Sequence, residues 1–175
     1  MDVCVDLSNE KQMREICARL KKERLTLLDH ITRLAQSVGY SVFQEYTCER
    51  AGHFYNSCIQ PRFKRFHRGD DKEFPFTAFA KKPIEDPVQF YRQEIERLFT
   101  RAADLLPLEQ IKDEEQLQNF VLCSQANVVF ITASQLLVEQ HRLKQQSSFG
   151  FTTLVAFNAH TISDVDFLIA ASCMQ

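Results

Sequence analysis

With 175 residues, the chain is long enough for one domain with a substantial hydrophobic core. Its residues are 45% hydrophobic and 25% charged, and its formal net charge of −2 argues against nonspecific electrostatic binding to nucleic acid or to an anionic membrane. The four glycines are too few for a β-sandwich with many tight turns or for glycine-rich phosphate loops.

The first residues do not form a secretory signal, because Asp2 and Asp6 interrupt them and no long apolar run follows. No stretch reaches the roughly 18 apolar residues of a membrane span. The six cysteines are scattered, as expected of reduced thiols. We therefore expect an intracellular protein that has no membrane partner, in the cytoplasm or the nucleus.

The first predicted element is a long amphipathic helix from about Asn9 to Val38. Two series of residues recur there at seven-residue intervals: Met13, Leu20, Leu27 and Leu34, and Cys17, Arg24, Ile31 and Val38. This 4-3 spacing is typical of coiled coils. Ser8 or Asn9 is placed to cap the beginning of the helix, and Gly39 its end.

Two interpretations of this helix remain open. Ile16, Leu25, Leu28 and Ala35 widen the apolar stripe, and a wide stripe favours a helix packed on several neighbours. A true coiled coil with a second chain is the alternative. The predicted contact face, which we call the seam, consists of Met13, Leu20, Arg24, Leu27, Ile31, Leu34 and Val38. Arg24 would set the register or the oligomeric state.

An irregular segment follows, from about residue 40 to residue 83. Residues 41–46 are rich in β-formers and predict a short strand. The stretch from Pro61 to Pro83 combines clustered charge with prolines and a turn-like Arg68-Gly69, and predicts a long ordered loop. Loops of this length in compact domains are often functional.

One local pattern in this segment is Cys48, His53 and Cys58, spaced Cys-x4-His-x4-Cys. With a glycine directly before the histidine, it resembles the second half of a zinc knuckle. That resemblance implies tetrahedral zinc and contacts to single-stranded nucleic acid. The chain departs from the family because Glu45 stands where a cysteine belongs. A zinc site would need Glu45 or His67 as its fourth ligand; otherwise the cysteines are unrelated thiols.

A second pattern is basic and aromatic: Arg62, Lys64, Arg65 and Arg68 alternate with phenylalanines. This composition is typical of surfaces that contact phosphates and stack on bases. An extended backbone would not separate a basic side from an aromatic side. The alternative is a loop whose rings anchor it to the core while its charges stay in solvent.

The remainder, residues 84–175, is expected to be helical. Asp86 and Pro87 predict the beginning of one helix, and Pro107 its end. A second helix begins near Asp113, and its apolar spacing continues through residue 143. The run 128–131 supports a buried strand as well, but this continuation favours a helix. Ser163 and Asp166 form a capping pair for a last helix.

The sequence as a whole predicts a mainly α fold: a helical bundle with a long heptad-patterned first helix and an irregular insert. Its parts are residues 1–39, 40–83 and 84–175, in one compact domain. Because catalytic motifs are absent, we expect a non-enzymatic module that binds a protein partner or self-associates. The alternatives are nucleic-acid binding through the zinc-knuckle-like and basic segments, and an enzyme that uses a Cys/His pair. Zinc is the one candidate cofactor.

Overall fold

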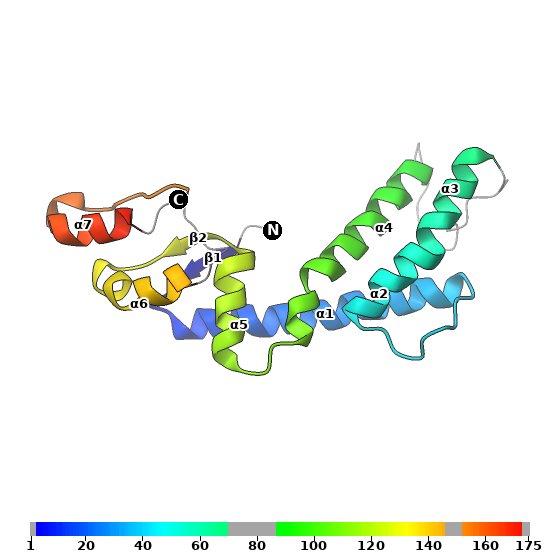
Figure 1. Cartoon of the computed structure of the whole chain (residues 1–175), viewed down its shortest axis with the longest axis horizontal. Coiled ribbons are helices and arrows are strands. Elements are labelled where there is room, and N and C mark those ends of the chain that lie inside the picture. Colours follow the sequence, from blue (N-terminus) through cyan, green and yellow to red (C-terminus); the bar gives the residue numbers. More distant parts are fainter. Residues whose placement is uncertain (1–2, 70–86, 146–151, 173–175) are drawn as a thin grey trace. The chain divides into compact units, whose positions relative to one another are not determined.

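The computed structural model describes residues 3–69, 87–145 and 152–172, with the backbone alone for residues 87–88 and 140–145 (Figure 1). It divides into two compact units. The central unit is residues 19–111, and the terminal unit combines residues 1–18 with residues 112–175. Because the described residues are mostly in helices and form only a small sheet, the predicted mainly α class is confirmed.

The central unit contains most of α1 (Glu10–Ser37), then α2 (Cys48–Phe54), the π-helical turn η1 (Tyr55–Ile59), α3 (Gln60–Arg68), α4 (Pro87–Asp104) and the 3₁₀ turn η3 (Leu106–Glu109). The terminal unit contains β1 (Val3–Asp6), the beginning of α1, α5 (Glu114–Phe120), the π-helical turn η4 (Val121–Gln125), β2 (Ala126–Phe130), α6 (Ala133–Gln145), η5 (Ala159–Thr161) and α7 (Asp164–Ala171). None of the helices within these described ranges is long and apolar enough to cross a bilayer.

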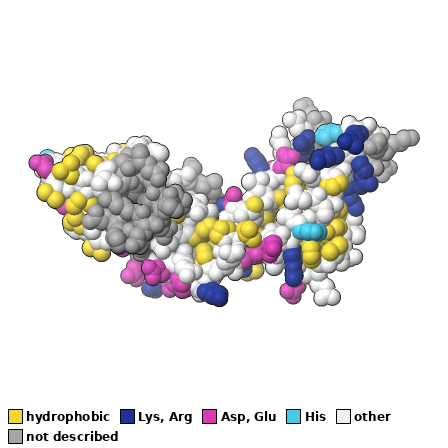
Figure 2. Space-filling view, in the orientation of Figure 1, with side chains coloured by type: hydrophobic (Ala, Val, Ile, Leu, Met, Phe, Trp, Pro, Cys, Tyr) yellow, Lys and Arg dark blue, Asp and Glu magenta, His cyan; other side chains and the backbone are white. Residues whose placement is uncertain are grey.

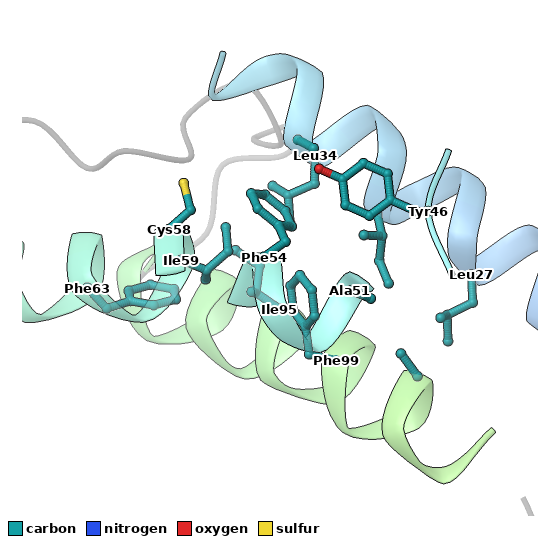
Figure 3. Packing of buried hydrophobic residues seen from close by; sticks show 13 residues of the cluster. Leu27, Leu34, Tyr46, Ala51, Phe54, Cys58, Ile59, Phe63, Ile95 and Phe99 are labelled. Atoms are coloured by element: carbon teal, nitrogen blue, oxygen red, sulfur yellow. The ribbon is translucent and has the colours of Figure 1, made fainter. Parts of the chain in front are cut away.

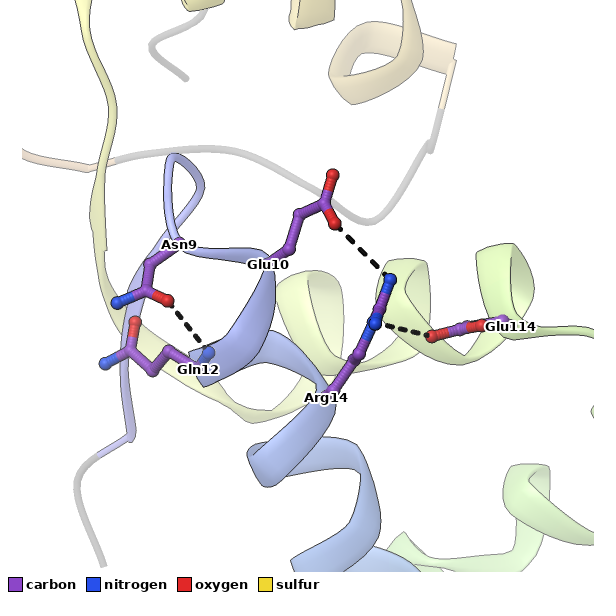
Figure 4. Close-up of polar contacts among 5 residues, drawn as sticks. All are labelled: Asn9, Glu10, Gln12, Arg14 and Glu114. Atoms are coloured by element: carbon purple, nitrogen blue, oxygen red, sulfur yellow. Dashed lines mark hydrogen bonds and ion pairs between the residues drawn. The ribbon is translucent and has the colours of Figure 1, made fainter.

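The long first helix is confirmed, and both of its ends are capped as the sequence predicts. At its beginning, Asn9 Oδ1 accepts a hydrogen bond from the Gln12 N–H at 3.0 Å (Figure 4). At its end, Gly39 adopts a φ of 68°. This left-handed turn lets the Gly39 N–H reach the Gln36 carbonyl at 3.1 Å and the Tyr40 N–H reach the Ala35 carbonyl at 2.9 Å.

The core of the central unit lies between α1, the α2–η1 segment and α4 (Figure 3). Ile31, Phe54 and Ile59 have no exposed surface at all. The Phe54 and Phe99 rings pack with centroids 5.8 Å apart. Burying such side chains stabilises the unit by roughly 1.5–3 kcal/mol each.

The insert differs from its prediction. Residues 41–46 form no strand, and residues 48–68 are helical rather than irregular. Thr47 starts α2, because its Oγ1 accepts a hydrogen bond from the Arg50 N–H at 3.2 Å. Pro61 does not break the helical path, because the π-helical turn η1 comes immediately before it and widens the backbone there. The rest of the predicted loop, from residue 70 to Pro83, lies outside the described residues.

The terminal unit contains the second correction. The run from Val128 to Phe130, which we expected to be helical, belongs to strand β2, and it pairs in parallel with β1. Val5 lies opposite Val129 and is fully buried. The helix predicted from Asp113 therefore ends at Phe120, and α6 is a separate helix. Pairing with the distant residues 3–6 outweighed the helical spacing.

Three other predicted helix ends are confirmed. The α4 helix ends at Asp104, before Pro107. Asp113 caps α5 by accepting the Gln116 N–H at 2.7 Å, and Ser163 caps α7 by accepting the Asp166 N–H at 3.2 Å. The predicted cap Asp86 lies outside the described residues. In the terminal unit, Arg14 pairs with Glu10 and Glu114 at the surface, where such pairs add little stability (Figure 4).

Two glycine substitutions test the backbone of the central unit. A Cβ at Gly39 would meet no atom within 4 Å, so Gly39→Ala adds no clash and its cost comes from the positive φ. We expect a loss of about 1–2 kcal/mol in the free energy of unfolding, measured with urea. Gly52→Ala, in the interior of α2 and equally uncrowded, is the control and should stabilise by about 0.4–1 kcal/mol. Equal effects at both positions would contradict the Gly39 cap.

Candidate functional site

Most of the predicted seam on α1 is buried inside the chain. Leu27, Ile31 and Leu34 belong to the core of the central unit, and Val38 packs against it half-buried. Leu20 is 2% exposed and Met13 is 5% exposed. These side chains therefore already have apolar surroundings within the chain, as expected of a helix that packs on several neighbours.

Arg24, the charged member of the seam, is engaged inside the central unit. Its Nη1 lies 3.7 Å from Glu109 Oε1, and both side chains are mostly shielded from solvent. The same Glu109 oxygen accepts the N–H of Cys48 at 2.8 Å. Glu109 thus accepts the first backbone N–H of α2 and also pairs with the guanidinium of Arg24 on α1. This arrangement gives Arg24 a structural role in the chain's own packing.

The predicted zinc ligands do not come together. Among the described residues no three His, Cys, Asp or Glu side chains could hold a metal ion. Cys48 and Cys58 are buried in the helical segment, whereas Glu45 and His53 are exposed. Because residues 48–58 are helical, the knuckle-like spacing does not produce a knuckle's loop geometry.

Each histidine of the predicted zinc site has another neighbour. His53 Nδ1 lies 3.4 Å from the Tyr40 hydroxyl, and its ring packs edge-on against Phe43 with centroids 5.5 Å apart. His67 Nε2 lies 2.9 Å from Arg92 Nη1 on α4. None of these contacts involves a cysteine. The two histidines therefore contact neighbouring side chains and do not form a zinc coordination sphere.

The two thiols of the predicted zinc site, Cys48 and Cys58, are poor nucleophiles. Burial, reinforced by the neighbouring Glu109 carboxylate, raises the pKa of Cys48 to about 12. Burial also raises the pKa of Cys58, although Arg62 and Arg65 oppose the shift. A protonated thiol neither attacks a substrate nor binds zinc well. This chemistry does not favour catalysis by Cys48 or Cys58.

The basic segment is a helix, which changes how its cations are arranged. Lys64, Arg65 and Arg68 fall on one side of α3 and are exposed, whereas Phe63 on the other side is buried. Figure 2 shows Lys and Arg side chains gathered over the end of the molecule where α3 lies. Arg62 has a separate role, because its Nη2 donates to the Val38 carbonyl at 2.9 Å. We call Lys64, Arg65 and Arg68 the basic face.

An apolar surface lies on the terminal unit. Thirteen large hydrophobic side chains are exposed among the described residues, and ten of them belong to this unit. We call these ten the apolar surface: Val128, Phe130, Leu137, Val138, Leu154, Val155, Phe157, Val165, Phe167 and Leu168. Yellow patches over α7 in Figure 2 are part of it. Its sequence signal is the apolar residues on more than one side of the helices from Pro87 onward, which fit either a tight core or a surface that another chain covers.

No family model matches the chain. The chain is similar to the pre-mRNA-splicing factor cwf11 of Schizosaccharomyces pombe, with 23% identity over 158 residues. The match covers 79% of this chain and 12% of the yeast protein, so the chain spans only a small part of that relative. This likeness indicates distant homology and does not show a specific function.

The thiol environments are directly testable with iodoacetamide. In the native protein near neutral pH, we expect the exposed Cys4 to be alkylated well before Cys48 and Cys58, because burial keeps both of those thiols covered and protonated. Peptide mass spectrometry over a time course measures the order. Urea-unfolded protein is the control, and there the difference should disappear. Rapid native labelling of Cys48 would contradict its buried position against Glu109.

Proposed function

We propose that the chain is a non-enzymatic protein-interaction module that works in a nuclear pre-mRNA-splicing assembly. The observation that carries this proposal is the apolar surface of the terminal unit. Scattered exposed hydrophobic residues are normal on a monomer, but ten of the thirteen exposed large hydrophobic side chains among the described residues belong to this one unit, which favours a binding surface there. Covering such side chains contributes roughly 25 cal/mol for each Å² removed from water.

The same observation favours one face of the chain for partner binding. The α1 seam is buried within the chain, so binding through Leu27 or Ile31 would require the central core to open. Val155, Phe157 and Leu168 are 68%, 76% and 67% exposed and need no such rearrangement. We therefore assign the partner contact to the apolar surface instead of the seam.

The splicing context rests on the similarity to cwf11, whose name describes a pre-mRNA-splicing factor. A splicing assembly is nuclear and made of many chains, so a module with an uncovered apolar surface fits that setting. Because the match covers 12% of the relative, the activity of that whole protein is not carried over.

The proposal predicts a specific set of co-purifying proteins. Tagged chain should retain pre-mRNA-splicing proteins from nuclear extract, identified by mass spectrometry. Phe157→Ser together with Leu168→Ser should reduce their recovery about tenfold or more, since losing two anchor side chains typically costs over 1 kcal/mol each. Leu25→Ser, at an equally exposed apolar position of the central unit, is the matched control. Equal recovery with all three proteins would contradict the assignment.

Nucleic-acid binding is the second candidate function, favoured by the basic face of α3. Lys64 and Arg68 stand four residues apart and therefore one turn apart, with Arg65 beside them. The helix gathers these exposed cations on one side, where together they could contact the phosphates of a single strand. Because the face has three cations and each contributes about 0.7 to the logarithmic salt slope, we expect weak binding with a slope of about 2 at most.

A single-stranded RNA probe tests this second candidate. We expect binding to weaken with salt, and Lys64→Gln with Arg68→Gln should flatten the logarithmic salt slope by about 0.7 for each phosphate that the variant no longer neutralises. Fluorescence anisotropy measures the slope. Lys11→Gln with Lys21→Gln, at exposed positions of α1, controls for the reduced net positive charge. A slope that both double variants change equally would contradict a role for the basic face.

A further inference from the structure

The two outer edges of the small sheet differ in whether their backbone groups are free to pair with another strand. The Leu7 N–H donates to the Phe130 carbonyl at 3.0 Å, so the backbone groups of Phe130 face β1. Backbone groups alternate in direction along a strand, and those of Asn127 and Val129 therefore face away from β1. On β1, by the same alternation, the groups of Cys4 and Asp6 face away from β2.

The outer edge of β1 is closed by one side chain. The Gln12 carboxamide accepts the Asp6 N–H at 2.9 Å through Oε1 and donates to the Cys4 carbonyl at 3.4 Å through Nε2. It therefore occupies the place that a peptide group of a third strand would take. Another strand cannot add at this edge without displacing Gln12.

The outer edge of β2 is open among the described residues, whose sheet has two strands. The sequence of β2 has no charge and no proline to discourage pairing. One face of the sheet is also uncovered, with Val128 45% and Phe130 49% exposed. Parallel sheets are usually covered on both faces and contain more than two strands, so this sheet is incomplete as it stands.

We propose that the β2 edge pairs with the β2 edge of a second copy of this chain, antiparallel and about a two-fold axis. The proposal rests on the proposed function and names one partner for part of the apolar surface. With the axis at Val128, Asn127 of one copy lies opposite Val129 of the other, and these outward-facing residues exchange their N–H and carbonyl groups. Val128 lies beside its own counterpart, and the Phe130 side chains extend the shared apolar face.

A second copy is the favoured occupant because each chain offers one open edge and one closed edge. Two open edges per chain would let pairing continue into filaments, whereas a single one gives a closed dimer. The pairing is self-complementary, since the short uncharged strand places no like charges opposite each other. The resulting sheet has four strands and ends at Gln12 on both sides.

Sedimentation velocity over a wide range of concentrations tests the proposal on the full chain. Wild type should sediment as a reversible dimer. Val129→Pro removes an outward N–H without touching the bonds to β1, and should weaken the dimer by about tenfold or more, equivalent to ~1.4 kcal/mol. Val129→Thr keeps the N–H and the β-branched shape, and is the matched control that should dimerise normally.

A second variant covers the case in which Val129→Pro fails to fold. Val128→Lys leaves the backbone intact and sets two like charges side by side across the axis, so the dimer should dissociate and recover partly at high salt. A wild type that is monomeric throughout overturns the proposal, as does a dimer that none of these changes weakens. Either result leaves the proposed function standing if splicing proteins are still retained through Phe157 and Leu168.

Discussion

Burial of one face of α1 is the constraint on which the central unit depends. Leu27, Ile31 and Leu34 supply that face, and Phe54 from the α2–η1 segment lies in the same cluster together with residues of α4. Polar contacts add to this burial, because Glu109 pairs with Arg24 and also accepts a hydrogen bond from the first N–H of α2. The heptad pattern thus describes an internal wall of the central unit.

A widened turn makes the basic face possible. Pro61 removes a backbone donor in the middle of an otherwise continuous helical path, and the π-helical turn η1 before it absorbs the defect. The helix then continues, buries Phe63 and turns Lys64 and Arg68 outward on the same side. In an extended backbone, Lys64 and Arg68 would still share a side, but Arg65 would point to the opposite one. The helical path through Pro61 therefore places Arg65 beside the other two cations.

The sequence predicted what depends on neighbouring residues. The stripe of α1, the cap at Gly39 and the caps at Asp113 and Ser163 were all readable because their causes lie within a few residues. Strand β2 was not, because its partner β1 is more than a hundred residues away. The residues of the apolar surface could not be predicted for a related reason: apolar composition does not tell whether a side chain is covered, which only the tertiary structure decides. The zinc hypothesis failed because ligand spacing was interpreted without knowing that residues 48–58 are helical.

Gln12 couples two elements that would otherwise open separately. Its N–H is held by Asn9 in the first turn of α1, while its side chain covers the edge of β1. Fraying of that first turn must therefore uncover the strand edge at the same moment, and closing the edge must re-form the turn. The beginning of α1 and the outer edge of β1 therefore behave as one cooperative unit. When the first turn of the helix unfolds transiently, the backbone groups at that edge become free to pair with another strand.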